Sequence, residues 1–297
     1  MSEPTGIPAP TQGRLRSARR LTKKKFRLET GTFLAEGPQA VREALAREGT
    51  VTELFVADDS LARNDDFIAA ARAAGIPVLA TAPDDLAELT DTVTPQGLVA
   101  VCRAVDLELD RLPRHLALVV VCAQIRDPGN AGSVIRAADA FGADAVIFSA
   151  DSVEVHNPKV VRASAGSVFH LPIVTGAHLH NTVEFLRDKG MLVLAAEGGG
   201  SDRLDHLDTD GALAGPVAWL MGNEAWGLPP EHAVLADRQV AVPIFGDAES
   251  LNLATAAAVC LYTTAAAQQR ANPVDDTGAP LDEAPLDDAP SEERRPG

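Results

Sequence analysis

An asparagine and an arginine stand six residues apart in the segment IRDPGNAGSVIRAADAFG, which follows a long apolar run. Asn130 is in a position to cap a helix, and Arg136 projects from the polar side of that helix. An amide and a guanidinium near one helix start could together hold an anionic group such as a phosphate. The plainer interpretation, a capping asparagine with an unrelated surface arginine, is favoured when this segment is taken alone.

A second polar segment, LMGNEAWGLP, also ends an apolar run. Glycine at a strand end, as at Gly222, lets backbone amides approach a ligand closely. The carboxylate of Glu224 could accept hydrogen bonds from a sugar hydroxyl or an amine. An ordinary turn explains the same residues equally well.

The third segment is VPIFGDAESLNLATAAAVCLY. We predict that Ser250 caps a final helix reaching to about residue 268 and that Asn252 lies in its first turn. The alanine-rich apolar side of this helix suits close packing against another helix, for example that of a second subunit. The residues of that side are Leu251, Ala254, Ala258, Leu261 and Ala265.

Several common catalytic motifs are missing from the sequence. It contains no GxGxxG fingerprint, no GxxxxGKS or GxxxxGKT loop and no GxSxG elbow, and the glycines from Gly198 to Gly200 are predicted to form a flexible loop. The seven histidines are scattered, so neither a metal site nor a catalytic histidine is indicated. Cys102, Cys122 and Cys260 lie far apart in apolar contexts and are predicted to be buried thiols.

Strand-like and helical runs alternate from Gly31 onward, which predicts an α/β protein of two domains. We assign the smaller domain to residues 28–106, a linker to 107–116 and the larger domain to 117–270. The run LALVVVCA opens the larger domain, and such a continuous β-branched run is typical of a parallel sheet buried on both faces.

Charge is divided unevenly along the 297 residues, whose net charge is −16. Residues 1–27 carry eight Lys or Arg against one acid, a net of +7. They could form a basic amphipathic helix on an anionic partner or a frayed, solvated N-terminus, and we assign them as a basic flexible arm. Residues 271–297 carry eight acids, two arginines and five prolines, and are predicted to be a disordered acidic tail. So acidic a chain can bind nucleic acid only through a local basic patch. The absence of a membrane span and of a signal peptide predicts a cytoplasmic protein.

Taken together, these segments resemble the SpoU (TrmH-type) RNA 2'-O-ribose methyltransferases of the SPOUT superfamily. The matching motifs are NAGSVIRAADAFGAD, MGNEAWGL and VPIFGDAESLNLATAAA, with KVVRASAGSVFHLPI between them, over roughly residues 117–268. Upstream, FLAEGPQAVREAL and TPQGLVAV resemble the α/β substrate-binding domain of many members.

The resemblance implies a trefoil-knotted parallel sheet in the C-terminal domain, S-adenosylmethionine as cofactor, no metal, and a homodimer formed through that domain. Its catalytic residues would be Arg136, Asn130, Glu224, Ser250 and Asn252. Its cofactor-binding residues would be Ala196, Glu197, Gly198, Met221, Gly222, Val242, Ile244, Leu251 and Leu253. Arg136 is often described as a base in this family, but the reluctance of a guanidinium to lose its proton favours a clamp on the adjacent phosphate.

The predicted partner is RNA, with ribosomal RNA the first expectation and transfer RNA the second. The predicted contacts come from the arm and from one residue beside the site: Arg14, Arg16, Arg19, Arg20, Lys23, Lys24, Lys25, Arg27 and Arg162. A knotted RNA-binding or assembly factor without catalysis is the alternative of another class. The missing glycine fingerprint argues against a nucleotide-dependent oxidoreductase.

Overall fold

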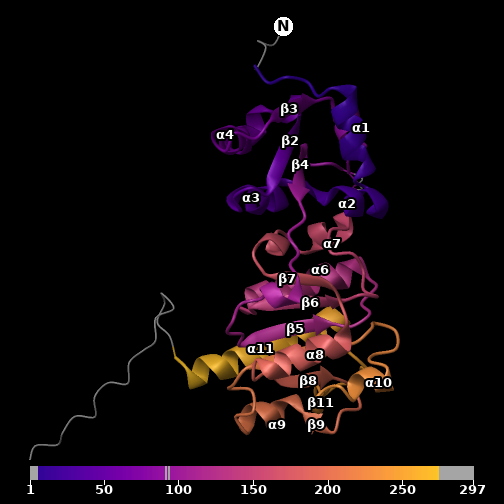
Figure 1. Ribbon diagram of the computed structural model, residues 1–297, viewed down its shortest axis with the longest axis vertical. Helices are drawn as coiled ribbons and strands as arrows, with labels where there is room; N and C mark the ends of the chain where they lie inside the picture. The colour runs from indigo at the N-terminus through magenta and orange to yellow at the C-terminus, as the bar shows by residue number, and fades with distance from the viewer. Residues whose placement is uncertain (1–5, 91, 93, 274–297) are drawn as a thin grey trace, which may run out of the picture.

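The structure is a computed structural model that describes residues 6–90, 92 and 94–273, and these form two α/β domains along the long axis of the molecule (Figure 1). The predicted fold class, a larger parallel-sheet domain with a smaller N-terminal α/β domain, is confirmed. The first five residues of the predicted arm and the predicted tail from residue 274 lie outside the described residues.

The N-terminal domain is a four-stranded sheet of order β1-β4-β2-β3 with helices packed against it. Strands β1 and β2 both run antiparallel to β4, and β3 runs parallel to β2. Five of the six residues of β4 are buried, which places this strand at the centre of the domain. The elements are α1 (Gln12–Arg20), α2 (Lys24–Thr30), β1 (Thr32–Glu36), α3 (Pro38–Ala46), β2 (Val51–Ala57), α4 (Asp65–Ala73), β3 (Val78–Thr81), α5 (Pro83–Ala87) and β4 (Leu98–Arg103), with short 3-10 turns at Asp58–Ser60 and Ala62–Asn64.

The basic N-terminal segment is folded where we expected a flexible arm. Residues 12–30 form two helices, and Leu15, Ala18 and Leu21 are buried in a cluster with β2, β4 and α5. Apolar residues three apart put one face of α1 on the sheet and leave its cations on the other face. The assignment as a flexible arm was wrong because the burial of Leu15, Ala18 and Leu21 against the sheet outweighs the repulsion among the many cations.

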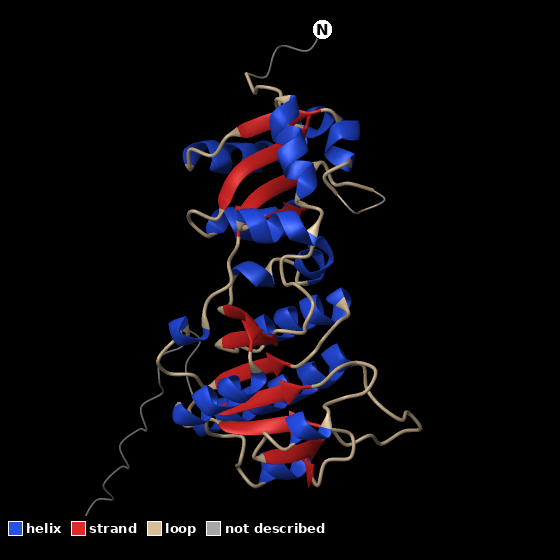
Figure 2. Cartoon of the chain, turned by 45° about the vertical axis from the view of Figure 1, so that its right-hand side comes forward, coloured by secondary structure: helices blue, strands red, loops and turns tan. Residues whose placement is uncertain are grey.

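The C-terminal domain contains a seven-stranded sheet of order β7-β6-β5-β10-β8-β11-β9 in which every pair is parallel (Figures 1 and 2). Strand order alone does not define the threading of the chain, so the trefoil knot stays a prediction. The elements are β5 (Leu118–Cys122), α6 (Pro128–Ala140), β6 (Ala145–Ser149), α7 (Pro158–Ala163), β7 (Ile173–Ala177), α8 (Leu179–Asp188), β8 (Leu192–Ala196), β9 (Asp202–Arg203), α9 (Leu204–Thr209), β10 (Val217–Met221), α10 (Pro230–Ala233), β11 (Arg238–Ala241) and α11 (Leu253–Ala271).

The central strands are buried on both faces, as the β-branched run predicted. All five residues of β5 and of β10 are buried. Alternate residues enter two different apolar clusters: Val120 and Trp219 pack with α6 and α11, whereas Val121 and Leu220 pack with α8 and α10. This alternation follows from the two-residue period of a strand, so helices must cover both faces. The three cysteines are buried thiols, as predicted.

Residues 107–116, which we expected to be a linker, lie against the C-terminal domain. Leu107 bridges to Val174 of β7, and Leu112 and Leu116 are buried in the cluster beneath α8. A 3-10 turn at Leu109–Arg111 separates these contacts. The segment is therefore packed along most of its length.

Charged side chains join the two domains. Arg27 is 4% exposed and forms a two-pronged ion pair with Glu154 of the C-terminal domain, at 2.7 and 2.5 Å. Arg47 of α3 donates to the carbonyl of Phe169 at 3.2 Å. These bonds, with the stacking of Phe33 on Phe169, fix the N-terminal domain to the edge of the C-terminal domain that carries α7.

His170 bridges the domains between two carboxylates. Its Nδ1 lies 2.8 Å from Asp139 of α6, and its Nε2 lies 3.0 Å from Glu43 of α3. Burial lowers the pKa of His170, but the bonds to Asp139 and Glu43 outweigh burial and leave the pKa above 6.5. The charged imidazole is thus favoured in the folded protein.

We predict that His170 makes the stability of the protein depend on pH. Because its pKa is raised on folding, its stabilising contribution is complete below a pH of about 6.5 and is lost as the pH rises through the raised pKa. Urea unfolding at several pH values should show a steeper fall in the free energy of unfolding for the wild type than for His170→Gln. Parallel curves for the two proteins would contradict this prediction.

Candidate functional site

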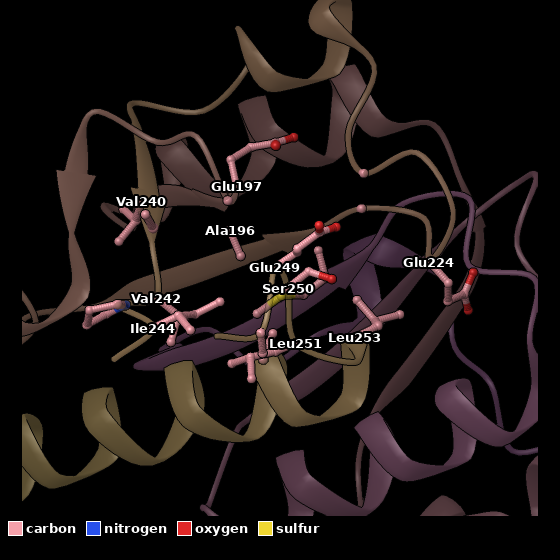
Figure 3. Close-up of a pocket in the computed structure, with 18 of the residues that line it drawn as sticks. Ala196, Glu197, Glu224, Val240, Val242, Ile244, Glu249, Ser250, Leu251 and Leu253 are labelled. Carbon is pink, nitrogen blue, oxygen red and sulfur yellow. The ribbon is translucent and has the colours of Figure 1, made fainter. Parts of the chain in front are cut away.

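A cavity of about 610 Å³ opens at the carboxyl ends of β8, β10 and β11 and at the start of α11 (Figure 3). In an open α/β sheet, ligands bind at these ends of the strands. Three loops build the walls: residues 196–198, 221–228 and 240–256. Each follows a strand of the parallel sheet, so the order of the strands brings the loops together.

All nine residues predicted to bind a cofactor line this cavity. They come from the three loops, and Figure 3 shows the apolar members, among them Val242 and Ile244, facing the cavity. The nine are Ala196, Glu197, Gly198, Met221, Gly222, Val242, Ile244, Leu251 and Leu253. The structure therefore brings the predicted set together in one place.

Sequence reasoning missed a residue that shapes the wall of the cavity. Asn223 is 6% exposed; its Nδ2 donates to the carbonyl of Gln124 at 2.6 Å, and its Oδ1 accepts from Ala225 N. Asn223 and Gly227 also exchange two backbone hydrogen bonds at 2.9 Å. These bonds close residues 223–227 into a tight turn and tie that turn to the loop after β5. A polar residue two positions after a fully buried strand was the available signal.

Glu224, Asn130 and Asn252 form one hydrogen-bonded group beside the cavity, which we call the amide–carboxylate cluster. Asn130 Nδ2 donates to Glu224 at 3.3 Å, and Asn130 Oδ1 accepts from Asn252 Nδ2 at 3.0 Å. Glu224 also accepts from the backbone amides of Arg126 and Asp127. The cluster joins segments that lie about a hundred residues apart in the chain.

Both predicted helix caps were wrong by a few residues. Asp127 caps α6 and accepts from Asn130 N at 2.8 Å, so Asn130 is inside the first turn with its side chain free for the cluster. Asn252 caps α11 through Oδ1, which accepts from Ala254 N, and Ser250 lies before the helix in the wall of the cavity. The predictions were wrong because each segment contains two residues that can cap a helix, Asp127 and Asn130 in one and Ser250 and Asn252 in the other.

Arg136 lies on the same helix as Asn130 but forms no hydrogen bond with the amide–carboxylate cluster among the described residues. It is exposed on α6, and within residues 6–90, 92 and 94–273 no side-chain hydrogen bond or ion pair of its guanidinium is found. Arg162 of α7 lies 3.5 Å from Glu36 at the domain junction. The two arginines are therefore on the surface, outside the cavity wall.

The predicted RNA-binding cations differ in their availability. Arg27 is buried in its pair with Glu154, so its assignment as an RNA contact was wrong. Ion pairs engage several others: Arg14 with Glu53, Arg19 with Glu88 and Lys25 with Glu29, while Arg20 lies over the ring of Phe26. Arg16, Lys23 and Lys24 are exposed.

The charges around the cavity favour a cationic ligand. Glu197, Glu224 and Glu249 contribute carboxylates to its lining, and Glu197 also accepts from Leu228 N at 3.0 Å. No group of three metal-binding side chains occurs among the residues that the structure describes. The walls otherwise offer apolar side chains and strand-end backbone groups, which suit an organic ligand with a positive charge.

The fold and cavity define a two-domain α/β protein whose parallel sheet carries a ligand pocket made of strand-end loops. Comparison with known proteins identifies the family of each domain. Residues 117–262 match the model of the SpoU rRNA methylase family, and residues 13–100 match that of the MRM3-like substrate-binding domain.

Relatives cover most of the chain. It is 33% identical over 244 residues to the 23S rRNA (guanosine(2553)-2'-O)-methyltransferase RlmP of Bacillus subtilis, covering 82% of this chain and 92% of that protein. The AdoMet-bound rRNA methyltransferase from Sinorhizobium meliloti is 32% identical, with a TM-score of 0.75 over 89% of this chain and 97% of that one. AviRb from Streptomyces viridochromogenes in complex with AdoMet is 30% identical, with a TM-score of 0.75 over 88% and 98%. The chain belongs to the SpoU rRNA methylase family.

We predict that Gly222 is required for the closed arrangement of the cavity wall. A Cβ atom at this position would lie 2.4 Å from the carbonyl carbon of Gly227 and 2.5 Å from Leu228 N, so the backbone would have to shift. Gly222→Ala should lower the free energy of unfolding by about 1–3 kcal/mol in urea denaturation. The control Gly199→Ala adds its methyl group to open space and should change that free energy by less than about 0.5 kcal/mol. Equal effects of the two substitutions would refute the close-approach argument.

Proposed function

We propose that this protein transfers a methyl group from S-adenosylmethionine to a ribose 2'-hydroxyl of ribosomal RNA. The observation that carries the proposal is the amide–carboxylate cluster, which lies directly beside a cavity lined by all nine predicted cofactor residues. The names of RlmP and of the AdoMet-bound structural relatives support the reaction and the cofactor. A cytoplasmic location is part of the proposal, because ribosomal RNA is made and assembled there in bacteria.

The cavity fits S-adenosylmethionine in size and charge. Its volume of about 610 Å³ lies within the range of about 300–1,000 Å³ typical of small-molecule sites. Apolar residues such as Leu251 and Leu253 would contact the adenosine part, and the carboxylates of Glu197 and Glu249 would favour a positive charge. When bound, S-adenosylmethionine supplies a sulfonium methyl group that a hydroxyl oxygen can attack.

The protein's own residues would position the RNA for this attack. A ribose hydroxyl is a weak nucleophile, so it must be held in line with the methyl group while it loses its proton. The amide–carboxylate cluster, with Ser250 beside it, offers donors and acceptors that would orient the ribose. The positively charged guanidinium of Arg136 would hold the neighbouring phosphate.

Arg136→Ala should lower the rate of methyl transfer by roughly 10²–10³, the effect of losing one such charged contact in a transition state. S-adenosylmethionine affinity should stay within about two-fold, because Arg136 lies outside the cavity. The measurement uses methyl-labelled S-adenosylmethionine with 23S ribosomal RNA, followed by nuclease mapping, and calorimetry for the cofactor. Arg114→Ala, which removes another exposed arginine, is the control.

A wild-type protein that binds S-adenosylmethionine but labels no ribosomal RNA would overturn the proposed substrate. A fully active Arg136→Ala variant would overturn only the role of Arg136.

We also propose a homodimer formed through the C-terminal domain. Tyr262 on α11 is 61% exposed and meets Phe141, which follows α6, at a centroid distance of 5.5 Å. Leu261, which we predicted for the subunit contact, is instead buried within its own chain because it faces the sheet. Since α6 also carries Arg136, a partner on this pair of helices would allow one subunit to contribute to the other's site.

The exposed cations of α1 and α2 are the proposed RNA contacts of the N-terminal domain. Arg16, Lys23 and Lys24 lie on the outer face of these helices, whose inner face is held by Leu15 and Leu21. Their positive charge stands out on a chain of net charge −16, so these few cations must carry much of the electrostatic attraction to phosphates.

The variant Arg16→Ala/Lys23→Ala/Lys24→Ala should weaken RNA binding and reduce the slope of log Kd against log salt concentration by about 2. The physical reason is that fewer counterions are released from the RNA. Filter binding of 23S ribosomal RNA at several salt concentrations measures both quantities. Arg14→Ala, whose guanidinium is already paired with Glu53, should change them little. An unchanged slope for the triple variant would exclude this surface.

A further inference from the structure

Trp226 is an exposed indole at the edge of the functional site. It is 52% exposed, whereas Trp219, the other tryptophan of the chain, is fully buried and donates to Thr264. Its neighbours Ala225 and Gly227 line the cavity, but Trp226 does not, so its side chain is directed outside the wall. An indole left half in water gives up much of the stabilisation that burial would provide.

The backbone that carries Trp226 is held tightly in place. Asn223 and Gly227 close the turn with two backbone bonds, and Asn223 Oδ1 accepts from Ala225 N at 2.9 Å. Glu224 anchors the same turn to the loop after β5 through backbone amides at 3.1 and 3.4 Å. Trp226 is therefore presented by a rigid turn.

Arg126 supports the indole from the neighbouring loop. Its guanidinium carbon lies 5.3 Å from the centre of the Trp226 ring, within the range of a cation–π contact. The backbone amide of Arg126 is one of those that Glu224 holds, so Glu224 sets the two side chains beside each other. Arg126 takes part in no ion pair within the described part of the chain. We call this pair the Trp226–Arg126 platform.

We propose that the Trp226–Arg126 platform stacks a nucleobase of the RNA substrate next to the nucleotide that is methylated. The inference rests on the proposed function, since the platform adjoins the cavity through Glu224 and Ala225. Every nucleobase has a π face that stacks on an indole, and the cation of Arg126 can reach an adjacent phosphate. A nucleobase is favoured over a protein partner because one indole paired with one arginine presents a flat π face and a cation, which suit a base and its phosphate.

The platform lies where it could hold the RNA substrate in position for the reaction. The amide–carboxylate cluster is built on the same Glu224 that anchors the platform, so a base stacked on Trp226 and a ribose at the cluster would be held by one rigid unit. Fixing a neighbouring base lowers the freedom of the reacting sugar. Trp226 thereby acts as a positioning residue of the proposed reaction.

Fluorescence of the full-length protein tests whether RNA contacts Trp226. Trp219 contributes fluorescence to both the wild type and Trp226→Phe, so the difference between the two proteins is the signal of Trp226. Trp219 is fully buried and is therefore shielded from RNA and from acrylamide. In the presence of S-adenosylhomocysteine, 23S ribosomal RNA should quench this difference signal, and acrylamide should quench it only before RNA is added. Strong protection from acrylamide in the RNA-free protein would mean that a second copy of the chain covers Trp226, which would overturn the proposal.

Kinetics test whether the contact is used. Trp226→Ala should raise KM for RNA roughly ten-fold, the loss expected for one stacked base, with S-adenosylmethionine affinity unchanged. Trp226→Phe should restore most of that loss, because a phenyl ring also stacks. Val234→Ala, which trims another exposed apolar side chain, is the control and should leave KM unchanged.

The outcomes separate this proposal from the proposed function. If the wild type methylates RNA while Trp226→Ala keeps its KM and RNA does not quench Trp226, the platform is refuted and the function stands. A wild type that binds RNA with quenching of Trp226 but transfers no methyl group would refute the function and retain the platform as an RNA contact.

Discussion

The site depends on the hydrogen bonds that tie the loops after β5, β10 and β11 to one another. Parallel strands bring the loops to one edge of the sheet, but their spacing is set by Glu224, which bonds to the loop after β5 and to Asn130, and by Asn252, which caps α11 while bonding to Asn130. The side chain of Asn130, in the segment after β5, thus bonds to the loops after both β10 and β11. Because hydrogen bonds are directional, these contacts restrict the loops to one arrangement more closely than apolar packing alone would.

The same edge is connected to the N-terminal domain. Helix α6 carries Asn130 and Arg136 and, at its other end, Asp139, which contacts His170 and through it Glu43 of α3. The buried pair of Arg27 and Glu154 adds a second connection. RNA held by the N-terminal domain would therefore meet the site at a defined distance and angle, because the joint between the domains is made of directional bonds.

The sequence predicted the parts of this structure that follow from period and composition. The β-branched run at 118–122 indicated a buried parallel strand, and the nine cofactor-binding residues expected from the resemblance to the SpoU family all lie in the lining of one cavity. The helices at residues 12–30 were not predicted because they are stabilised by the burial of Leu15 and Leu21 against the sheet, a contact that the local sequence does not show. Arg27 was misjudged because Glu154, far away in the sequence, removes it from the surface. The caps at Asp127 and Asn252 depended on which of several equivalent side chains reaches the backbone.

The distribution of charge links the two ligands of the proposed reaction. Carboxylates at Glu197, Glu224 and Glu249 give the cavity a negative character that suits a sulfonium but repels an RNA backbone. Attraction to RNA must then come from elsewhere on the chain, from the exposed cations of α1 and α2 and from arginines beside the site. Close to the cavity, stacking of nucleobases therefore contributes more to RNA binding than attraction to phosphates does. An indole supported by Arg126 supplies such a contact at the point where the local potential is least favourable to RNA.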